Sequence, residues 1–252
     1  MGFRAVVFDI GGVLEFTPPM GMAEKWADRL GLAPGELPER LSTVFAAGQV
    51  GALTEAEVHG HIGQKLALGP ADVDAFMGDL WTEYLGTLNA ELTAYFAGLR
   101  PAYRTGIISN SFVGARDRER ERYGFEQLTD EIIYSHEVGI SKPDPRIYEL
   151  ACERLGVLPE EMIFLDDVEP NVAAAQDLGA HAIVFVDVAD TGHPLGAWVR
   201  RLADEGVLAT VVAGQVRMLT HLDVDARDVD TALGAWRKVA AEFGVLSSAT
   251  TH

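Results

Sequence analysis

The sequence predicts an α/β fold: a three-layer, Rossmann-like parallel sheet with an inserted helical cap and a small α+β extension at the C-terminus. Short apolar runs suited to buried strands alternate with amphipathic helical segments, which is typical of a parallel sheet covered on both faces. One long stretch near the N-terminus breaks this alternation and is helical throughout. The chain has 252 residues, 48% of them hydrophobic, which is enough for a packed interior.

The expected strands are short apolar runs that end on polar residues. The first, residues 4–9, ends in Asp9 before a glycine pair, which indicates a buried strand that opens into a tight loop. In the helix expected before Gly156, apolar side chains share one face, and the glycine suits the helix end. The later strands are expected at residues 105–111, 131–135, 161–167 and 181–187.

The domain organisation follows from the pattern of helices. Residues 17–90 contain amphipathic helical patterns without a buried strand between them, so we expect a helical cap there. The core is then expected to comprise residues 1–16 and 91–187. Residues 188–252 should form the α+β extension, with a helix, two strands and a last helix. Because such a small unit cannot bury its apolar face alone, we expect it to pack or to form a homodimer.

Charge and composition limit the classes of partner that the protein is expected to bind. The chain has 20 Lys+Arg and 38 Asp+Glu, a formal net charge of −18, which disfavours binding to nucleic acid or to an anionic membrane. The one cysteine, Cys152, excludes an intramolecular disulfide and sits at a spacing typical of a buried helical residue. No secretory leader and no apolar run of membrane-spanning length is evident, so a cytoplasmic location is expected.

Polar residues of complementary chemistry follow four successive strands. Because ligands of doubly wound sheets bind outside the carboxyl ends of the strands, we expect these residues to share one site. Phosphoryl transfer through a covalent intermediate needs a carboxylate nucleophile, a divalent cation held by carboxylates, and cationic or hydroxyl groups around the phosphoryl oxygens. The residues that meet these needs are Asp9, Ser109, Asn110, Lys142, Asp166 and Asp167.

Four motifs in this order resemble those of the haloacid dehalogenase superfamily. They are FDIGGVL, IISNS, SKPDP and FLDD, spread over residues 8–167. The segments GALTEAEV, YGFE and NVAAAQDLGAHAIVF are similar to the phosphatase-type subgroup whose helical cap follows the first motif. The resemblance covers residues 3 to about 187.

The resemblance implies a Mg²⁺-dependent hydrolase that acts on a small phosphorylated metabolite. A lysine between nucleophile and substrate suits this chemistry, because it keeps the carboxylate ionised beside an incoming dianion. The implied roles are Asp9 as nucleophile and metal ligand, the Gly11 carbonyl and Asp167 as further ligands, Asp166 as support, Ser109 and Asn110 as phosphoryl-binding residues, and Lys142 as the group that offsets charge.

One position departs from the family pattern. The phosphatases carry a second Asp two residues after the nucleophile, as general acid, whereas this sequence has Gly11. Loss of a general acid costs on the order of 10² to 10⁴ in rate. Three possibilities stay open: a substrate with a good leaving group, a donor from elsewhere such as Glu15 or His136, or a phosphometabolite-binding or regulatory protein with little turnover.

A metal-independent 2-haloacid dehalogenase is a weaker alternative, since that variant of the family also lacks the second Asp. Two features count against it. The pair Gly11-Gly12 differs from the aromatic-glycine pattern of those enzymes, and the pair Asp166-Asp167 is typical of a metal site.

Other conspicuous residues have simpler interpretations. His59 and His61 do not share a helical face, so no zinc site is predicted. The charged run at residues 115–124 is expected to be a solvated helix face. The aromatic residues of the cap, Phe76, Trp81 and Tyr84 among them, are expected to be core.

The tail carries a second resemblance. Residues 198–239 resemble the C-terminal part of pyridoxal-phosphate-dependent threonine aldolases, in which an arginine that would correspond to Arg217 contacts a substrate carboxylate. Because the large catalytic domain of that family has no counterpart here, the resemblance does not imply aldolase activity.

Overall fold

The computed structural model describes residues 2–17, 20–185, 197, 201–202, 204, 209–212, 215–218 and 226–243. The chain divides into two compact units. The larger unit is Arg4–Ala182, and the smaller unit is Ile183–His252 together with Met1–Phe3.

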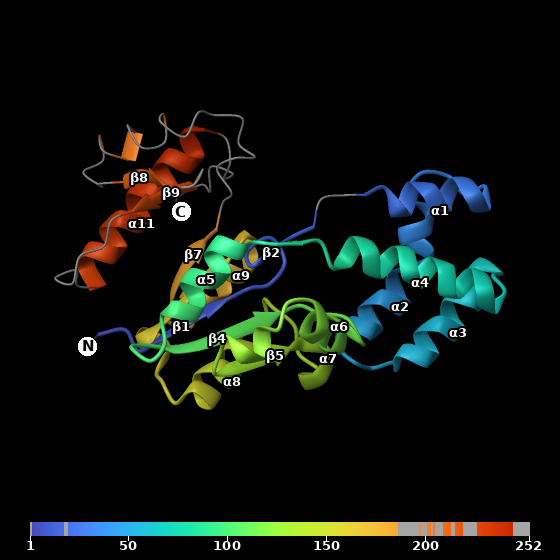
Figure 1. Ribbon diagram of the computed structural model, residues 1–252, viewed down its shortest axis with the longest axis horizontal. Coiled ribbons are helices and arrows are strands. Elements are labelled where there is room, and N and C mark those ends of the chain that lie inside the picture. The colour runs from blue at the N-terminus through green and yellow to red at the C-terminus, as the bar shows by residue number, and fades with distance from the viewer. Residues whose placement is uncertain are drawn as a thin grey trace. The chain divides into compact units, whose positions relative to one another are not determined.

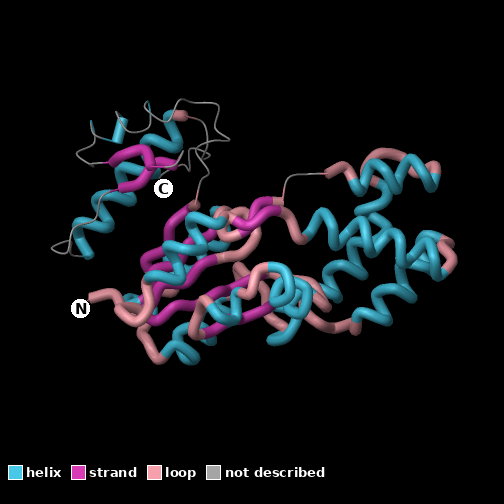
Figure 2. Tube along the Cα trace, viewed as in Figure 1, coloured by secondary structure: helices cyan, strands magenta, loops and turns pink. Residues whose placement is uncertain are grey.

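The centre of the larger unit is a five-stranded sheet in the order β5-β4-β1-β6-β7 (Figures 1 and 2). Strand β1 pairs in parallel with β4 on one side and with β6 on the other, and β4 pairs in parallel with β5. The α/β fold predicted from the sequence is therefore confirmed. The strands are β1 (Ala5–Phe8), β4 (Arg104–Ser109), β5 (Glu131–Tyr134), β6 (Met162–Asp166) and β7 (His181–Val184).

The observed strands are shorter than expected. Strand β4 ends at Ser109 rather than at residue 111, and Ser135, expected in a strand, begins helix α7. The predicted strand over 181–187 is observed to Val184, and residues 186 and 187 lie outside the described part of the chain.

Helices cover both faces of the sheet, which makes three layers. Neighbouring strand residues point to opposite faces. On one face, Phe8 of β1 stacks on Phe96 of helix α5, with ring centroids 4.7 Å apart. On the other, Gly106 of β4 leaves room for Leu155 of helix α8 beside Val7, because a Cβ at Gly106 would lie 3.0 Å from the leucine.

Helix α8 (Pro145–Leu155) ends at Gly156, as the sequence predicts. At the start of α8, the Asp144 side chain accepts a hydrogen bond from the amide of Arg146, and Pro145 occupies the first turn. Gly156 ends this helix with φ 67°, a left-handed conformation that glycine adopts without strain. The core helices are α5 (Ala90–Gly98), α6 (Ala115–Arg122), α7 (Ser135–Val138), α8 (Pro145–Leu155) and α9 (Glu169–Asp177), with 3₁₀ turns at Phe125–Gln127 and Pro159–Glu161.

Four helices between β1 and α5 form the cap, and they lie together in Figure 1. Their shared core includes fully buried Trp26 and Phe76, with Trp81 also buried and Tyr84 packed at its edge, as expected for these aromatic residues. Phe112 from the core domain completes this cluster. The cap helices are α1 (Met22–Leu30), α2 (Glu36–Gln49), α3 (Glu55–Leu66) and α4 (Pro70–Tyr84).

Two short strands connect cap and core. Strand β2 (Glu15–Phe16) leads into the cap and pairs antiparallel with β3 (Thr87–Leu88), which leads out. Strands of two residues are too short to show a hydrophobic period, so they are not predictable from the sequence pattern. The pairing brings the two linkers side by side.

The smaller unit contains antiparallel strands β8 (Ala209–Val212) and β9 (Gln215–Met218) and helix α11 (Ala226–Glu242). These match the expected two strands and last helix of the tail. Most of the other tail helix, expected at residues 194–206, lies outside the described residues. Among the described residues, no helix combines the length and hydropathy that crossing a bilayer requires.

Candidate active site

Asp9 lies directly after β1, at the carboxyl edge of the sheet. Its amide donates to the carbonyl of Leu165 (2.8 Å), which ties the residue to the neighbouring strand β6. Its carboxylate Oδ1 accepts a hydrogen bond from the amide of Ile10 (2.7 Å) and lies 2.7 Å from Lys142 Nζ. Within the described part of the chain, both polar contacts of this carboxylate go to Oδ1, and Oδ2 has none.

Lys142 is the cation at the centre of the site. Its side chain is fully buried, and Nζ contacts Asp9 Oδ1 (2.7 Å), Asp166 Oδ2 (2.6 Å) and the carbonyl of Ile108 (2.9 Å). The ammonium group has three N–H donors, and each has an acceptor here. The lysine is therefore held in one position between two carboxylates.

Asp166, the last residue of β6, is completely buried. Besides Lys142, its carboxylate accepts hydrogen bonds from the amide of Val168 (2.8 Å) and from Asn171 Nδ2 (3.0 Å). A buried carboxylate with this many donors stays in place, so it can orient Lys142.

Asp9, Asp166 and Asp167 form a carboxylate trio in which one oxygen of each lies within 4.8 Å of the others. Asp167 is the exposed member. Its carboxylate comes so close to Gly12 that a Cβ there would overlap it, and Gly12 has φ 72°. Glycine is therefore required at this position of the first loop.

The charges of the trio are not balanced within the protein. Burial raises the pKa of Asp9 to about 7; Lys142 opposes this rise, and the charge of Asp166 adds to it. The pKa of Asp167 is also raised, by burial and then by Asp166. Ionisation of all three carboxylates beside one ammonium group would leave two negative charges, and hard divalent cations prefer oxygen donors. The donor set therefore fits Mg²⁺.

Ser109 is the last residue of β4, the strand that pairs with β1, and Asn110 follows it. Ser109 is buried. The Asn110 side chain bonds the main chain of Lys142 twice: Nδ2 donates to its carbonyl (2.8 Å), and Oδ1 accepts from its amide (2.8 Å). Asn110 therefore holds the lysine loop, a role that the sequence did not suggest.

Gly11 lies in open space. It is exposed, and a Cβ built there would meet nothing within 4 Å. Its φ is not in the left-handed region. The fold therefore has room for the acidic side chain that the family pattern places here.

The two proposed proton donors lie in different surroundings. Glu15 is buried in β2, accepts a hydrogen bond from Thr17 Oγ1 (2.6 Å), and has its pKa raised by burial to about 7. His136 Nδ1 lies 2.6 Å from Ser111 Oγ, and burial lowers the pKa of this histidine. Glu15 is thus the candidate that retains a proton near neutral pH.

The sequence predicts a solvated face for the charged helix α6, and this holds for only part of it: Asp117, Arg120 and Glu121 are exposed, but Glu119 is not. Glu119, in its middle, is only 1% exposed and accepts hydrogen bonds from Tyr134 and Tyr84. Ala115, Glu119 and Tyr123 are spaced four residues apart and so share one helical face. That spacing is the signal by which the sequence could have indicated a buried carboxyl group.

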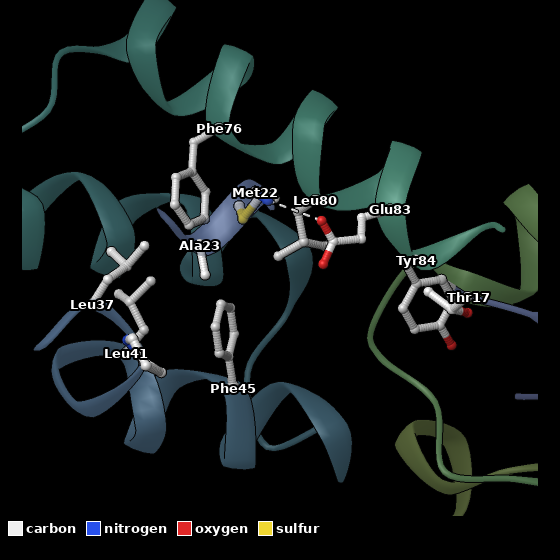
Figure 3. A pocket seen from close by; sticks show the side chains of 11 residues that line it. Thr17, Met22, Ala23, Leu37, Leu41, Phe45, Phe76, Leu80, Glu83 and Tyr84 are labelled. Carbon is white, nitrogen blue, oxygen red and sulfur yellow. Dashed lines mark hydrogen bonds between the residues drawn. The ribbon is translucent and has the colours of Figure 1, made fainter. Parts of the chain in front are cut away.

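The cap contains an apolar cavity of about 270 Å³ (Figure 3). Leu41, Phe45 and Phe76 line its interior, while Thr17 and Tyr84 stand together at one end. Thr17 donates a hydrogen bond to Glu15, and Tyr84 donates one to Glu119. This end of the cavity therefore adjoins the two linkers between cap and core.

The fold is a three-layer α/β fold whose sheet carries three aspartates and a buried lysine at its carboxyl edge. Residues 3–179 match the haloacid dehalogenase-like hydrolases, and the chain belongs to that family. The match ends before the tail, so the resemblance of residues 198–239 to threonine aldolases stays a prediction.

Similar proteins include the D-ribitol-5-phosphate phosphatase of Bacteroides thetaiotaomicron, 24% identical over 70% of this chain and 88% of its own length. Acyl-CoA dehydrogenase family member 10 of Mus musculus is 28% identical over 72% of this chain. The chain spans only 18% of that protein and 37% of the Rattus norvegicus bifunctional epoxide hydrolase 2.

Solved structures share the fold. A haloacid dehalogenase family enzyme from Bacteroides thetaiotaomicron, in complex with magnesium and inorganic phosphate, superposes with a TM-score of 0.63 at 22% identity, over 76% of this chain and 100% of that one. A 2-haloacid dehalogenase from Pseudomonas syringae gives a TM-score of 0.56 at 21% identity, over 76% and 89%. An enzyme in complex with magnesium and phosphate and a 2-haloacid dehalogenase thus share this architecture.

Proposed function

We propose that the protein is a Mg²⁺-dependent phosphatase that hydrolyses a small phosphorylated metabolite through a phosphoryl group on Asp9. The observation that carries this proposal is the carboxylate trio with the buried Lys142 between Asp9 and Asp166. A dehalogenase without metal has no need for the exposed third carboxylate, Asp167. The similarity to a D-ribitol-5-phosphate phosphatase supports the same class of substrate.

In this proposal Asp9 Oδ2 attacks phosphorus, the bond to the leaving oxygen breaks, and water then releases phosphate and regenerates the carboxylate. Lys142 offsets the negative charge between nucleophile and substrate, and Ser109 binds a phosphoryl oxygen. Asp9, Asp167 and the Gly11 carbonyl would hold Mg²⁺, with Asp166 in support. When bound, Mg²⁺ supplies Lewis-acid stabilisation of the phosphoryl charge.

The leaving oxygen needs a proton, and Gly11 supplies none. A substrate with a good leaving group, such as an acyl phosphate, avoids this need. Glu15 is our candidate donor for other esters, because its buried carboxyl group has a pKa raised to about 7. The open space at Gly11 favours a second candidate function, a phosphometabolite-binding protein with little turnover.

A panel of phosphorylated metabolites, which includes acetyl phosphate and ribitol 5-phosphate, tests the proposal. We expect phosphate release that requires Mg²⁺ and that Asp9→Asn abolishes. Silence across the panel together with tight binding of a phosphate ester would favour the binding protein. Metal-independent release of halide from 2-chloropropionate would favour the dehalogenase.

A further inference from the structure

Helix α6 presents four residues to the cap and its return linker, and we call this set the α6 clasp. Three of the residues belong to the helix, and the fourth directly follows it. Spacings of three or four residues among them place the side chains on neighbouring faces. Its members are Arg118, Glu119, Arg122 and Tyr123.

Glu119 is the buried centre of the clasp. Its Oε2 accepts a hydrogen bond from Tyr134 of β5 (2.7 Å), and its Oε1 accepts one from Tyr84 (3.3 Å). Tyr134 belongs to the central sheet, whereas Tyr84 is the last residue of the last cap helix, α4. The carboxyl group therefore bonds core and cap at the same time.

The two residues after Tyr84 are held by the same helix. Tyr123 Oη donates to the carbonyl of Leu85, and Arg122 Nη2 donates to the carbonyl of Gly86 (3.1 Å). A Cβ at Gly86 would overlap the Glu15 carboxylate, so the return linker also lies tightly against the first linker. Three consecutive linker residues thus have a partner on α6.

Arg118 extends the contact to the cap helices. Its guanidinium donates to Glu55 at the start of α3 (2.6 Å) and lies 4.1 Å from the ring of Trp81 on α4. The Trp81 ring in turn packs edge-on against Tyr84, with centroids 5.2 Å apart. Tyr84 is therefore fixed from two sides.

We propose that Glu119 is a positioning residue that fixes the cap relative to the catalytic edge, acting through the hydroxyl of Tyr84. Tyr84 also forms one end of the cap cavity (Figure 3), so its position sets the shape of that end. The placement of the cap by Glu119 does not depend on the reaction catalysed. Its effect on turnover rests on the proposed phosphatase function.

The charges around Glu119 make the clasp sensitive to pH. The groups that face its carboxyl are the phenols of Tyr84 and Tyr134, with Glu15 and Asp9 as further negative charges. Burial first, and then these two charges, raise the pKa of Glu119 from 4.5 to about 7, although both phenol hydrogen bonds lower it. Glu119 binds its proton more tightly while its contacts with Tyr84 and Tyr134 are formed. Breaking these contacts should therefore become easier as pH rises from about 4.5 through about 7.

Hydrogen exchange of the amides of residues 84–88 tests the proposal on the full chain. Glu119→Ala should speed exchange of this linker by about five- to tenfold, the loss typical of a hydrogen bond in a protein. Glu119→Gln should reduce the dependence on pH beyond intrinsic exchange, and Tyr84→Phe should reproduce the faster exchange. The dependence that stays in Glu119→Gln is expected from Glu15, whose pKa is also raised to about 7 and whose carboxylate lies against Gly86. In the core strand β1 exchange should not change.

The matched controls are Glu121→Ala and Tyr95→Phe, exposed residues of α6 and α5. In both control variants the amides of residues 84–88 should exchange at the wild-type rate. If Glu119→Ala does not fold, Tyr84→Phe decides, because it removes only one hydroxyl. Wild-type linker exchange in the folded clasp variants, or equal acceleration in the controls, would overturn the proposal.

Kinetics with p-nitrophenyl phosphate give a second measurement. Glu119→Ala should raise KM by about tenfold with a smaller change in kcat, since the cap and not the nucleophile is displaced. An unchanged KM together with a large fall in kcat would contradict a positioning role. If wild type turns over no ester at all, the proposed function fails, and the exchange measurement still tests Glu119.

Discussion

Two clusters of buried carboxyl groups lie in the larger unit, and their counter-charges differ. At the catalytic edge, Asp9 and Asp166 lie 2.7 and 2.6 Å from the ammonium group of Lys142. In the α6 clasp, Glu119 accepts hydrogen bonds from two neutral phenols and has Glu15 as a nearby negative charge. Burial raises the pKa of Asp9 and of Glu119 to about 7 in both clusters, so the clusters differ in their hydrogen-bond donors: an ammonium group in the first and neutral phenols in the second.

The largest expected effect lies at the catalytic edge. Asp9→Asn keeps the shape of the side chain but removes the nucleophile, so turnover of any phosphate ester should fall by at least about 10³-fold. Phosphate release under saturating Mg²⁺ measures this, with circular dichroism to show that the variant folds. Residual activity above a few per cent would mean that another group performs the attack.

Removal of the buried cation Lys142 should lower the stability of the fold strongly. Lys142→Met leaves Asp9 and Asp166 facing each other without compensation, which should cost about 3–5 kcal/mol of unfolding free energy at pH 7 in EDTA. Urea unfolding measures this. The matched control is Lys25→Met, which breaks the surface ion pair with Asp79 and should cost less than about 1 kcal/mol. Equal losses in both variants would show that the catalytic lysine contributes no more than a surface pair.

Gly11→Asp should add the missing general acid at the catalytic edge. Because a side chain there meets open space, the variant should fold, and turnover of esters with poor leaving groups should rise by about 10². Gly11→Asn, of the same size but without an acidic proton, is the control. A rise in both variants, or in neither, would show that proton donation does not limit the wild-type rate.

The smallest expected effect concerns the clasp and pH. The folded-state pKa of Glu119 is raised from 4.5 to about 7, so the stability linked to its protonated form is complete below about 4.5 and lost as pH rises through about 7. Glu119→Gln does not titrate, so its stability relative to wild type should improve by on the order of 1–3 kcal/mol across this window. Urea midpoints at pH 5 and pH 8 measure the change. If the stability difference between Glu119→Gln and wild type does not vary with pH, burial does not shift the pKa of Glu119 and the account of the clasp is wrong.

The two clusters also show what a sequence can reveal. Parallel strands bring their carboxyl ends to one edge, so Asp9, Lys142 and Asp166 could be assembled from strand order and family motifs alone. Glu119 could not, because its burial depends on the linker residue Tyr84, 35 positions earlier, and on the approach of the cap. The two-residue strands β2 and β3, which bring that linker into place, show no period of their own.

Asn110 illustrates a smaller gap. The family resemblance implies a phosphoryl-binding role for Asn110, which stays a prediction, and its side chain forms hydrogen bonds with the main chain of Lys142, 32 residues away in sequence. The order of the motifs identifies Asn110 as a site residue but does not reveal its hydrogen bonds with Lys142. The expected homodimer through the tail stays a prediction.

The most direct test of the central claim is to trap the covalent intermediate. Wild type turning over acetyl phosphate with Mg²⁺ is quenched in acid, digested and analysed by mass spectrometry. A phosphoryl group on the peptide that contains Asp9, absent without Mg²⁺ and absent in Asp9→Asn, is the predicted result. Phosphate release with an unmodified Asp9 peptide, or the phosphoryl group on another residue, would contradict the proposed mechanism.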